Sequence, residues 1–288
     1  MFWQQLLNGL VIGGVYALIA LGLTMVYGVL RILHIAHAAV YVLGAYVGLF
    51  AFLRLQNLLA AILLAMVVSS LVGVLIYRFV YRPMLSAPRI VPLIASIGLF
   101  MAFEDLYRLL FGPYVKSFQA PGAVSPLRLG TVVVTREQLL ILAVTAVLLA
   151  IVWMVVARTR IGLGWKAVAQ DLETALAMGV NANRVVAFNF LFGSALAATA
   201  GVLVGILYNS VYPAMGSMPA YKMLAVVVLG GLGSVPGTVV AALVLGLTET
   251  FMVGYVGFIL PRDAIAFVAL ILILLVRPQG LLGKAGAR

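Results

Sequence analysis

Long apolar runs follow one another along almost the whole sequence, and they leave few folds open to it. Residues 6–30 contain no charged side chain, and about 20 apolar residues in a helix cross the hydrocarbon core of a bilayer. Backbone polar groups at that depth must be paired within the protein, so only helices and closed barrels span it. The runs lack the alternation of barrel strands, and 65% of the residues are hydrophobic, too many for a soluble globule. The sequence therefore predicts an all-α integral membrane protein.

Brief polar interruptions divide the chain into about seven to nine expected transmembrane helices. The clearest spans are expected near residues 6–30, 36–53, 58–79, 90–111, 138–157, 185–207 and 263–276. Between residues 223 and 253, two apolar pieces are separated by a glycine-rich break from Gly230 to Gly237, which we interpret as a broken helix or short-helix hairpin. The count is nine if both pieces cross the membrane and seven if they are re-entrant. Residues 1–288 are expected to form a single transmembrane domain.

Basic residues fix the expected orientation of these helices. The net charge of +11 would suggest a nucleic-acid partner in a soluble protein, but here Lys and Arg gather in short loops, as the positive-inside rule expects. No nucleic acid is expected to bind. Residues 78–89, residues 158–184 and the tail from Arg277 are predicted to be cytoplasmic, and residues 112–137, with the β-prone stretch 131–135, are predicted to lie outside.

The segment of residues 161–186 is the longest polar interruption that can still form a helix. Apolar residues recur at steps of three and four, and polar residues occupy the other faces. These apolar residues are Trp165, Val168, Leu172 and Leu176. Gly179 supplies a stop signal. We therefore expect one short, two-faced helix between Arg160 and Gly179, outside the lipid, where a partner protein can contact it.

Two glycine motifs resemble nucleotide-binding loops but lack their context. Residues 162–167 match the GxGxxA pattern, yet no strand precedes them. The glycines after residue 229 are not followed by the Gly-Lys-Ser/Thr of a phosphate-binding loop. The sequence also contains no cysteine, which excludes disulfides. We expect this chain to bind no ATP and no other cofactor.

Few ionisable residues fall inside the expected spans. Glu104 and Asp105 precede Arg108 by about one helical turn, which predicts an ion pair near the outer boundary. Glu249 has no cation near it in the sequence, so a buried polar role is its expected one. No catalytic site is expected.

His34 and His37 are three residues apart and could share a helix face, but no third ligand accompanies them, so no metal site is expected. They are expected either as an interfacial pair near the end of a span or as a polar lining of a pathway.

Six stretches, taken together and in order, resemble the permease subunits of branched-chain amino acid ABC importers. They are GLVIGGVYALIALGLTMVYGV (9–29), HIAHAAVYVLGAY (34–46), YRPMLSAPRIVPLIASIGL (81–99), residues 161–186, LGGLGSVPGTVVAALVLGLTE (229–249) and RPQGLLG (277–283). The likeness covers nearly the whole chain.

The resemblance implies a multi-pass transport subunit in a prokaryotic cytoplasmic (inner) membrane, not an enzyme. Its partners would be membrane lipid, a second permease subunit, homologous or identical, two cytoplasmic ATPase subunits that bind ATP, and an extracytoplasmic substrate-binding protein. The helix from Gly164 to Gly179 resembles the coupling helix that docks on the ATPase. The residues assigned to this contact are Gly164, Lys166, Val168, Asp171, Leu172, Leu176 and Gly179.

The substrate pathway is expected at the helix break and at a polar helix junction. The residues assigned to it are His34, His37, Tyr41, Gly230, Gly231, Gly233 and Glu249. Members of the family usually have Asn-Phe-Ala-His-Gly followed by an acidic residue where this chain has HIAHAA (34–39). Because this turn is assigned to the pathway, the difference leaves the identity of the substrate undecided. Branched-chain or similar hydrophobic amino acids are expected, with urea or short amides as the alternative. A passive channel and a membrane-embedded hydrolase, using the acids and the two histidines, are alternatives from other classes.

Overall fold

The computed structural model describes residues 1–119, 127–129, 132–255, 257, 262–277 and 279–282. In this part of the chain the helices are α1 (Phe2–Leu30), α2 (His37–Leu55), α3 (Leu58–Ile76), α4 (Ile90–Phe111), α5 (Arg136–Arg158), α6 (Arg160–Gln170), α7 (Leu172–Ala177), α8 (Ala182–Leu207), α9 (Ser217–Gly230), α10 (Val235–Tyr255) and α11 (Arg262–Val276). A π-helical turn (Tyr77–Tyr81) and a 3-10 turn (Arg82–Met84) extend α3, and another 3-10 turn (Pro213–Gly216) precedes α9.

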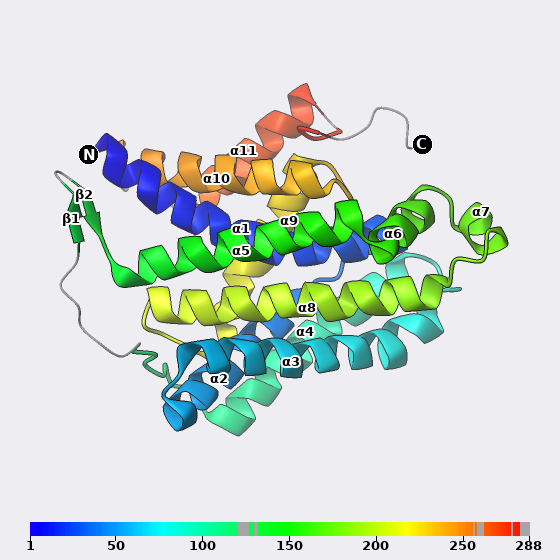
Figure 1. Cartoon of the computed structure of the whole chain (residues 1–288), viewed down its shortest axis with the longest axis horizontal. Coiled ribbons are helices and arrows are strands. Elements are labelled where there is room, and N and C mark those ends of the chain that lie inside the picture. Colours follow the sequence, from blue (N-terminus) through cyan, green and yellow to red (C-terminus); the bar gives the residue numbers. More distant parts are fainter. Residues whose placement is uncertain (120–126, 130–131, 256, 258–261, 278, 283–288) are drawn as a thin grey trace.

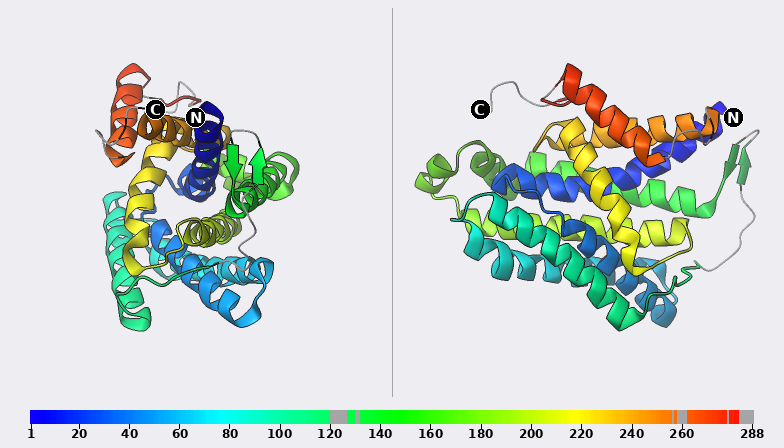
Figure 2. Two further views of the ribbon diagram at one scale, coloured as in Figure 1. Left: turned by 90° about the vertical axis from the view of Figure 1, so that its left-hand side faces the viewer. Right: turned by 180° about the vertical axis from the view of Figure 1, so that it is seen from behind.

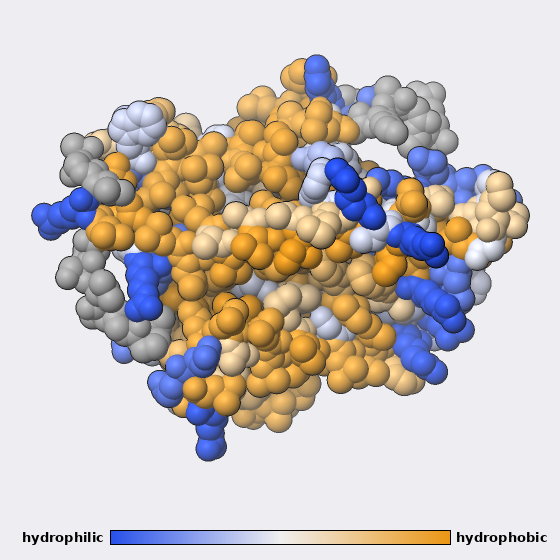
Figure 3. Space-filling model, viewed as in Figure 1, coloured by the Kyte–Doolittle hydropathy of each residue, from blue (hydrophilic) through white to orange (hydrophobic). Residues whose placement is uncertain are grey.

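The predicted all-α membrane architecture is confirmed. In the described part of the chain, seven helices are long and apolar enough to cross a membrane, namely α1, α2, α3 with its extension, α4, α5, α8 and α10. They run roughly along one direction in Figure 1, and hydrophobic side chains cover the middle of the face in Figure 3, with hydrophilic ones gathered at the two ends. The helices α9 and α11 have 14 and 15 residues, which corresponds to roughly 21–23 Å, less than a bilayer core of about 30 Å.

The two ends of the bundle carry different segments (Figures 1 and 2). The N-terminus lies near the antiparallel hairpin of β1 (Leu127–Leu129) and β2 (Val132–Val134), in which Leu127 pairs with Val134. The opposite end carries α6 and α7. We call these the hairpin end and the α6–α7 end. Residue 131 of the predicted β-prone stretch lies outside the described residues.

The core is built around α1, which packs against α10, α8, α9 and α5. In its most apolar window 83% of the residues are buried, against 17% in α4, so α4 leaves most of its surface to lipid or a partner. Small residues let the central helices approach closely. A Cβ on Gly201 of α8 would lie 2.1 Å from the Tyr41 carbonyl oxygen of α2, so only glycine fits there.

Two helices begin inside the bundle rather than at its surface. After α1 ends, residues 31–36 return into the core, and α2 starts where the His37 ring lies against Gly22 of α1. Gly22 is eight residues before the end of α1, roughly 12 Å along the helix. The start of α9 is similar, because Gly216 contacts Val42 and the Ala38 carbonyl of α2. Interior helix starts place irregular backbone at membrane depth, where it must be enclosed by protein.

The predicted glycine break is confirmed between α9 and α10. Gly231 and Gly233 there have φ of 98° and 82°, values that favour glycine. Residues from the end of the described chain close this turn, because the Leu281 N–H donates to the Leu229 carbonyl at 2.7 Å and the Leu282 N–H to the Gly230 carbonyl at 3.3 Å. The last carbonyls of α9 thus receive donors that their own helix cannot supply.

Candidate functional site

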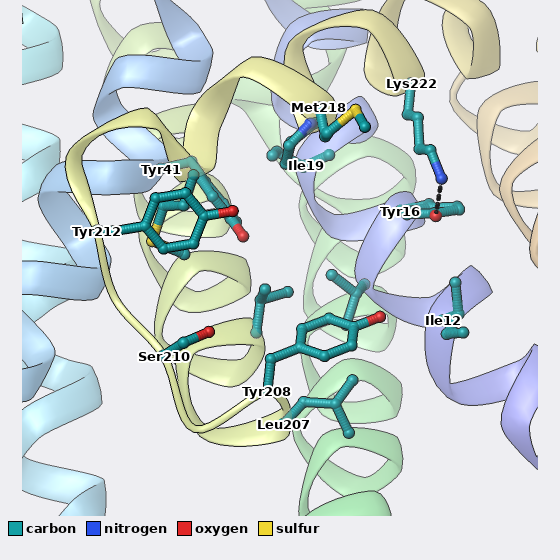
Figure 4. A pocket seen from close by; sticks show the side chains of 14 residues that line it. Ile12, Tyr16, Ile19, Tyr41, Leu207, Tyr208, Ser210, Tyr212, Met218 and Lys222 are labelled. Carbon is teal, nitrogen blue, oxygen red and sulfur yellow. Dashed lines mark hydrogen bonds between the residues drawn. The ribbon is translucent and has the colours of Figure 1, made fainter. Parts of the chain in front are cut away.

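A cavity of about 580 Å³ lies between α1, α2, α8 and α9 (Figure 4). Hydrocarbon side chains make up most of its wall: Ile12, Val15, Ile19, Val204, Leu207, Met215, Met218 and Pro219. The remaining lining residues are Tyr16, Tyr41, Tyr208, Ser210, Tyr212 and Lys222. A concave, mostly apolar site with a few polar groups is the usual form of a small-molecule binding site.

The polar groups come from elements far apart in the sequence. Figure 4 shows Tyr16 and Lys222 along one side of the cavity and Tyr41 and Tyr212 along the other. Tyr208 and Ser210 follow the end of α8 at the hairpin end, and the Tyr208 side chain is 54% exposed. The cavity therefore extends from the bundle interior, where α2 and α9 begin, toward the hairpin end.

A buried ion pair lies at this cavity. The Lys222 Nζ of α9 donates to the Tyr16 hydroxyl at 2.7 Å and to Glu249 Oε2 of α10 at 3.0 Å, and the Tyr16 hydroxyl donates to the same carboxylate oxygen at 2.9 Å. The side chains of Lys222 and Glu249 are 11% and 1% exposed. Removing one member would leave an uncompensated buried charge, so the pair and the hydroxyl form one unit.

Glu249 has no cation near it along the sequence, since Lys222 stands 27 positions earlier. The fold nevertheless brings the two side chains together. The sequence did not single out Lys222, because this residue directly precedes the apolar run that was expected to begin at Met223. A lysine at the end of an apolar run is typical of a membrane interface. Treating every lysine next to an apolar run as an intramembrane charge would have found it. Tyr16, Tyr208 and Tyr212 carried no such signal.

The residues predicted to line the pathway do not form one group. Tyr41 lines the cavity, and Glu249 lies behind Lys222 and Tyr16. Gly230, Gly231 and Gly233 instead form the turn between α9 and α10, against the chain at Gly280.

His34 and His37 lie in a separate cluster. The His34 Nδ1 is 2.6 Å from the Tyr81 hydroxyl, and its ring packs on Phe190. Both rings are buried within the protein, His34 in the re-entrant residues 31–36 and His37 at the start of α2. Neither histidine is among the cavity-lining residues.

The predicted ion pairing of the α4 acids with Arg108 is confirmed, and its place at the outer boundary stays a prediction. The guanidinium of Arg108 contacts both Glu104 and Asp105, at 2.9 Å for Asp105. Within the described ranges, no three His, Cys, Asp or Glu side chains are grouped to hold a metal ion. The acids of α4 are held in ion pairs with Arg108, and His34 lies against Tyr81 and Phe190.

The segment expected to form one coupling helix forms two helices. The helix is interrupted at Asp171, between α6 and α7. The Asp171 carboxylate accepts hydrogen bonds from the N–H groups of Glu173 and Thr174 at 2.9 and 3.2 Å and from the Thr174 hydroxyl at 2.6 Å. Asp171 thereby caps α7. The hydrogen bonds from Thr174, followed by that from Glu173, lower the pKa of the Asp171 carboxyl. The predicted stop at Gly179 is confirmed by its φ of 83°.

The expected single apolar face is also divided between the two helices. Trp165 and Val168 of α6 are buried, and the Trp165 Nε1–H donates to the Met25 carbonyl of α1 at 3.0 Å. In contrast, Leu172 and Leu176 of α7 are 49% and 52% exposed. The first helix is thus fastened to the core, and the second presents apolar side chains outward at the end of the bundle.

Comparisons with known proteins agree over nearly the full length. The family described as "Branched-chain amino acid transport system / permease component" matches residues 5–277. The chain is 36% identical to the high-affinity branched-chain amino acid transport system permease protein BraD of Pseudomonas aeruginosa, over 98% of this chain and 96% of that protein. It is 35% identical to the corresponding permease protein LivH of Escherichia coli K12, with the same shares covered.

One solved structure shares the fold at low sequence identity. PsaBC from Streptococcus pneumoniae in complex with Fab aligns with a TM-score of 0.53 and 14% identity, over 93% of this chain and 89% of that chain. At this identity the likeness concerns the fold alone.

Proposed function

The chain belongs to the family of permease components of branched-chain amino acid transport systems, and on that premise we propose that it carries branched-chain or similar hydrophobic amino acids through the cytoplasmic (inner) membrane. It is a multi-pass membrane protein with a role in transport. The observation that carries the proposal is the full-length similarity to permeases named for these amino acids. The same names favour amino acids over urea or short amides.

The cavity supports this choice of substrate. A branched-chain amino acid has a hydrocarbon end, which needs no hydrogen bonds, and a zwitterionic end, which needs charged or polar partners. The cavity offers hydrocarbon walls together with Lys222 and four tyrosines. Urea, which has no hydrocarbon part, would leave most of this wall without a matching surface.

The assembly proposed here is the one that the resemblance to ABC importer permeases implies, and features of the α6–α7 end support it. Two permease subunits, homologous or identical, would form the pore, a binding protein would deliver the substrate at the hairpin end, and two ATPase subunits would bind and hydrolyse ATP at the α6–α7 end. The exposed leucines of α7 suit a protein contact, and the anchoring of α6 to α1 through Trp165 suits the transmission of a rigid movement. Lys166, exposed on α6, and Gly164 belong to the same proposed contact.

Uptake in cells tests the substrate. A strain that lacks its own branched-chain and urea uptake systems is complemented with the complete transport system and supplied with labelled leucine or labelled urea. We expect leucine uptake that requires the permease. Urea uptake without leucine uptake would overturn the assignment, and leucine uptake without the ATPase subunits would favour a passive channel.

A further inference from the structure

Lys222 is the only charged residue among the described residues that line the cavity. We propose that its ammonium binds the α-carboxylate of the transported amino acid, and that Glu249 is a positioning residue that holds this ammonium in place. This inference rests on the proposed function and names the group of the substrate that is recognised.

The geometry distinguishes the roles of the two charges. Lys222 and Tyr16 line the cavity, whereas Glu249 does not and is 1% exposed. A substrate in the cavity therefore meets the cation and the phenol first, with the carboxylate of Glu249 behind them. Since the ammonium is already held by Glu249 and Tyr16, little freedom is lost when it binds a further anion.

The chemistry of the substrate matches this arrangement. A carboxylate that leaves water for an apolar cavity needs a charged partner, and charge-assisted hydrogen bonds are the strong ones. The Tyr16 hydroxyl, which donates to Glu249 in this structure, can rotate and donate to a substrate carboxylate beside Lys222.

The competing role for Lys222 is purely structural. Lys222, Glu249 and Tyr16 join α9, α10 and α1, so the ion pair fastens three helices of the bundle whether or not a substrate binds. The two roles differ in what they predict for a molecule that lacks a carboxylate. They also differ when both charges are removed together, which leaves no buried charge without a partner.

A single cysteine provides the readout, because the natural chain contains none. Ser210→Cys places a thiol in the cavity wall, and Ser117→Cys, at an exposed position of the hairpin end, is the matched control. The permease–ATPase complex in nanodiscs is treated with a small maleimide in the presence of leucine or leucinamide. Leucinamide keeps the side chain and the ammonium but has no carboxylate. We expect leucine, and not leucinamide, to slow the labelling of Ser210→Cys, with no effect on Ser117→Cys.

The test is completed by variants of the ion pair in the Ser210→Cys background. In Lys222→Gln combined with Glu249→Gln, the leucine concentration for half-protection should rise at least roughly tenfold, since hydrogen bonds to charged groups are lost. Lys222→Arg, which keeps a cation, should protect far better than the double variant. Equal protection by leucinamide, or wild-type protection in the double variant, would show a structural role only. If the wild type imports leucine but leucine gives no protection, the inference fails and the proposed function stands; absent leucine uptake refutes the function itself.

Discussion

At the scale of single residues, Asp171 decides where α6 ends and α7 begins. Its carboxylate satisfies N–H groups of a helix of six residues, which is too short to be stable without capping and packing. We predict that Asp171→Ala frays α7, whereas Asp171→Asn, which keeps a side-chain acceptor, preserves it. Hydrogen exchange of the amides of residues 173–177 in the assembled complex measures this. Equal exchange in the alanine variant and the wild type would contradict the capping role.

The same residue gives the cap a dependence on pH. Because its hydrogen bonds lower the pKa of the folded carboxyl, the cap contributes fully above the pKa of the unfolded chain and is lost as the pH falls through the lowered value. Protection of α7, corrected for intrinsic exchange, should therefore decrease in the acidic range in the wild type. It should stay unchanged in Asp171→Asn, which carries no titrating group at this position.

At the scale of elements, α7 carries the proposed contact with the ATPase. Leu172 is about half exposed in the isolated chain, so Leu172→Asp should change the stability of the permease by less than about 0.5 kcal/mol. In the assembled transporter the same aspartate would enter a desolvated contact at a cost of several kcal/mol. We predict normal insertion with loss of substrate-stimulated ATPase activity in proteoliposomes.

The control for this substitution is Leu172→Met, which keeps an apolar side chain of similar volume. It should retain most of the stimulated activity. Full stimulation in Leu172→Asp would refute the contact, and a failure to insert would point to a role inside the permease instead.

Elements with strong periodic signals could be predicted from the sequence, and those set by tertiary contacts could not. The bounds of α4 match the expected residues 90–111, since Pro88 and Arg89 precede a mostly apolar stretch and Gly112 and Pro113 follow it. The division at Asp171 was missed because the spacing of Leu172 continues the pattern of Trp165 and Val168, although the side chain of Asp171 competes for the backbone. The burial of His34 follows from the return of residues 31–36 into the core, which no periodicity reveals.

For the same reason, only part of the candidate site could be predicted from the sequence. Glu249 could be singled out because an acid in an apolar run is conspicuous. Its partner Lys222 and the hydroxyl of Tyr16 come from other helices, so only the packing of α1, α9 and α10 identifies the three as one unit.

At the scale of the whole molecule, the two ends of the bundle are predicted to lie on opposite sides of the membrane. The α6–α7 end carries basic residues 158, 160, 166 and 184 and should be cytoplasmic. Single cysteines at Gln170 and Ser117 can be treated with an impermeant reagent in intact cells. Ser117→Cys should react and Gln170→Cys should react only after the membrane is opened. The reverse pattern would invert the orientation.

The closure of the α9–α10 turn by Leu281 and Leu282 bears on how the protein is made. The ribosome synthesises α9 and α10 before these residues, so the carbonyls of Leu229 and Gly230 lack these two donors until residues 281 and 282 have been added. The turn is thus completed only after the chain of the preceding helices has been synthesised, because two of its donors lie beyond α11. A chain that ended at residue 276 would contain all the described helices but would leave these two carbonyls of α9 without their donors.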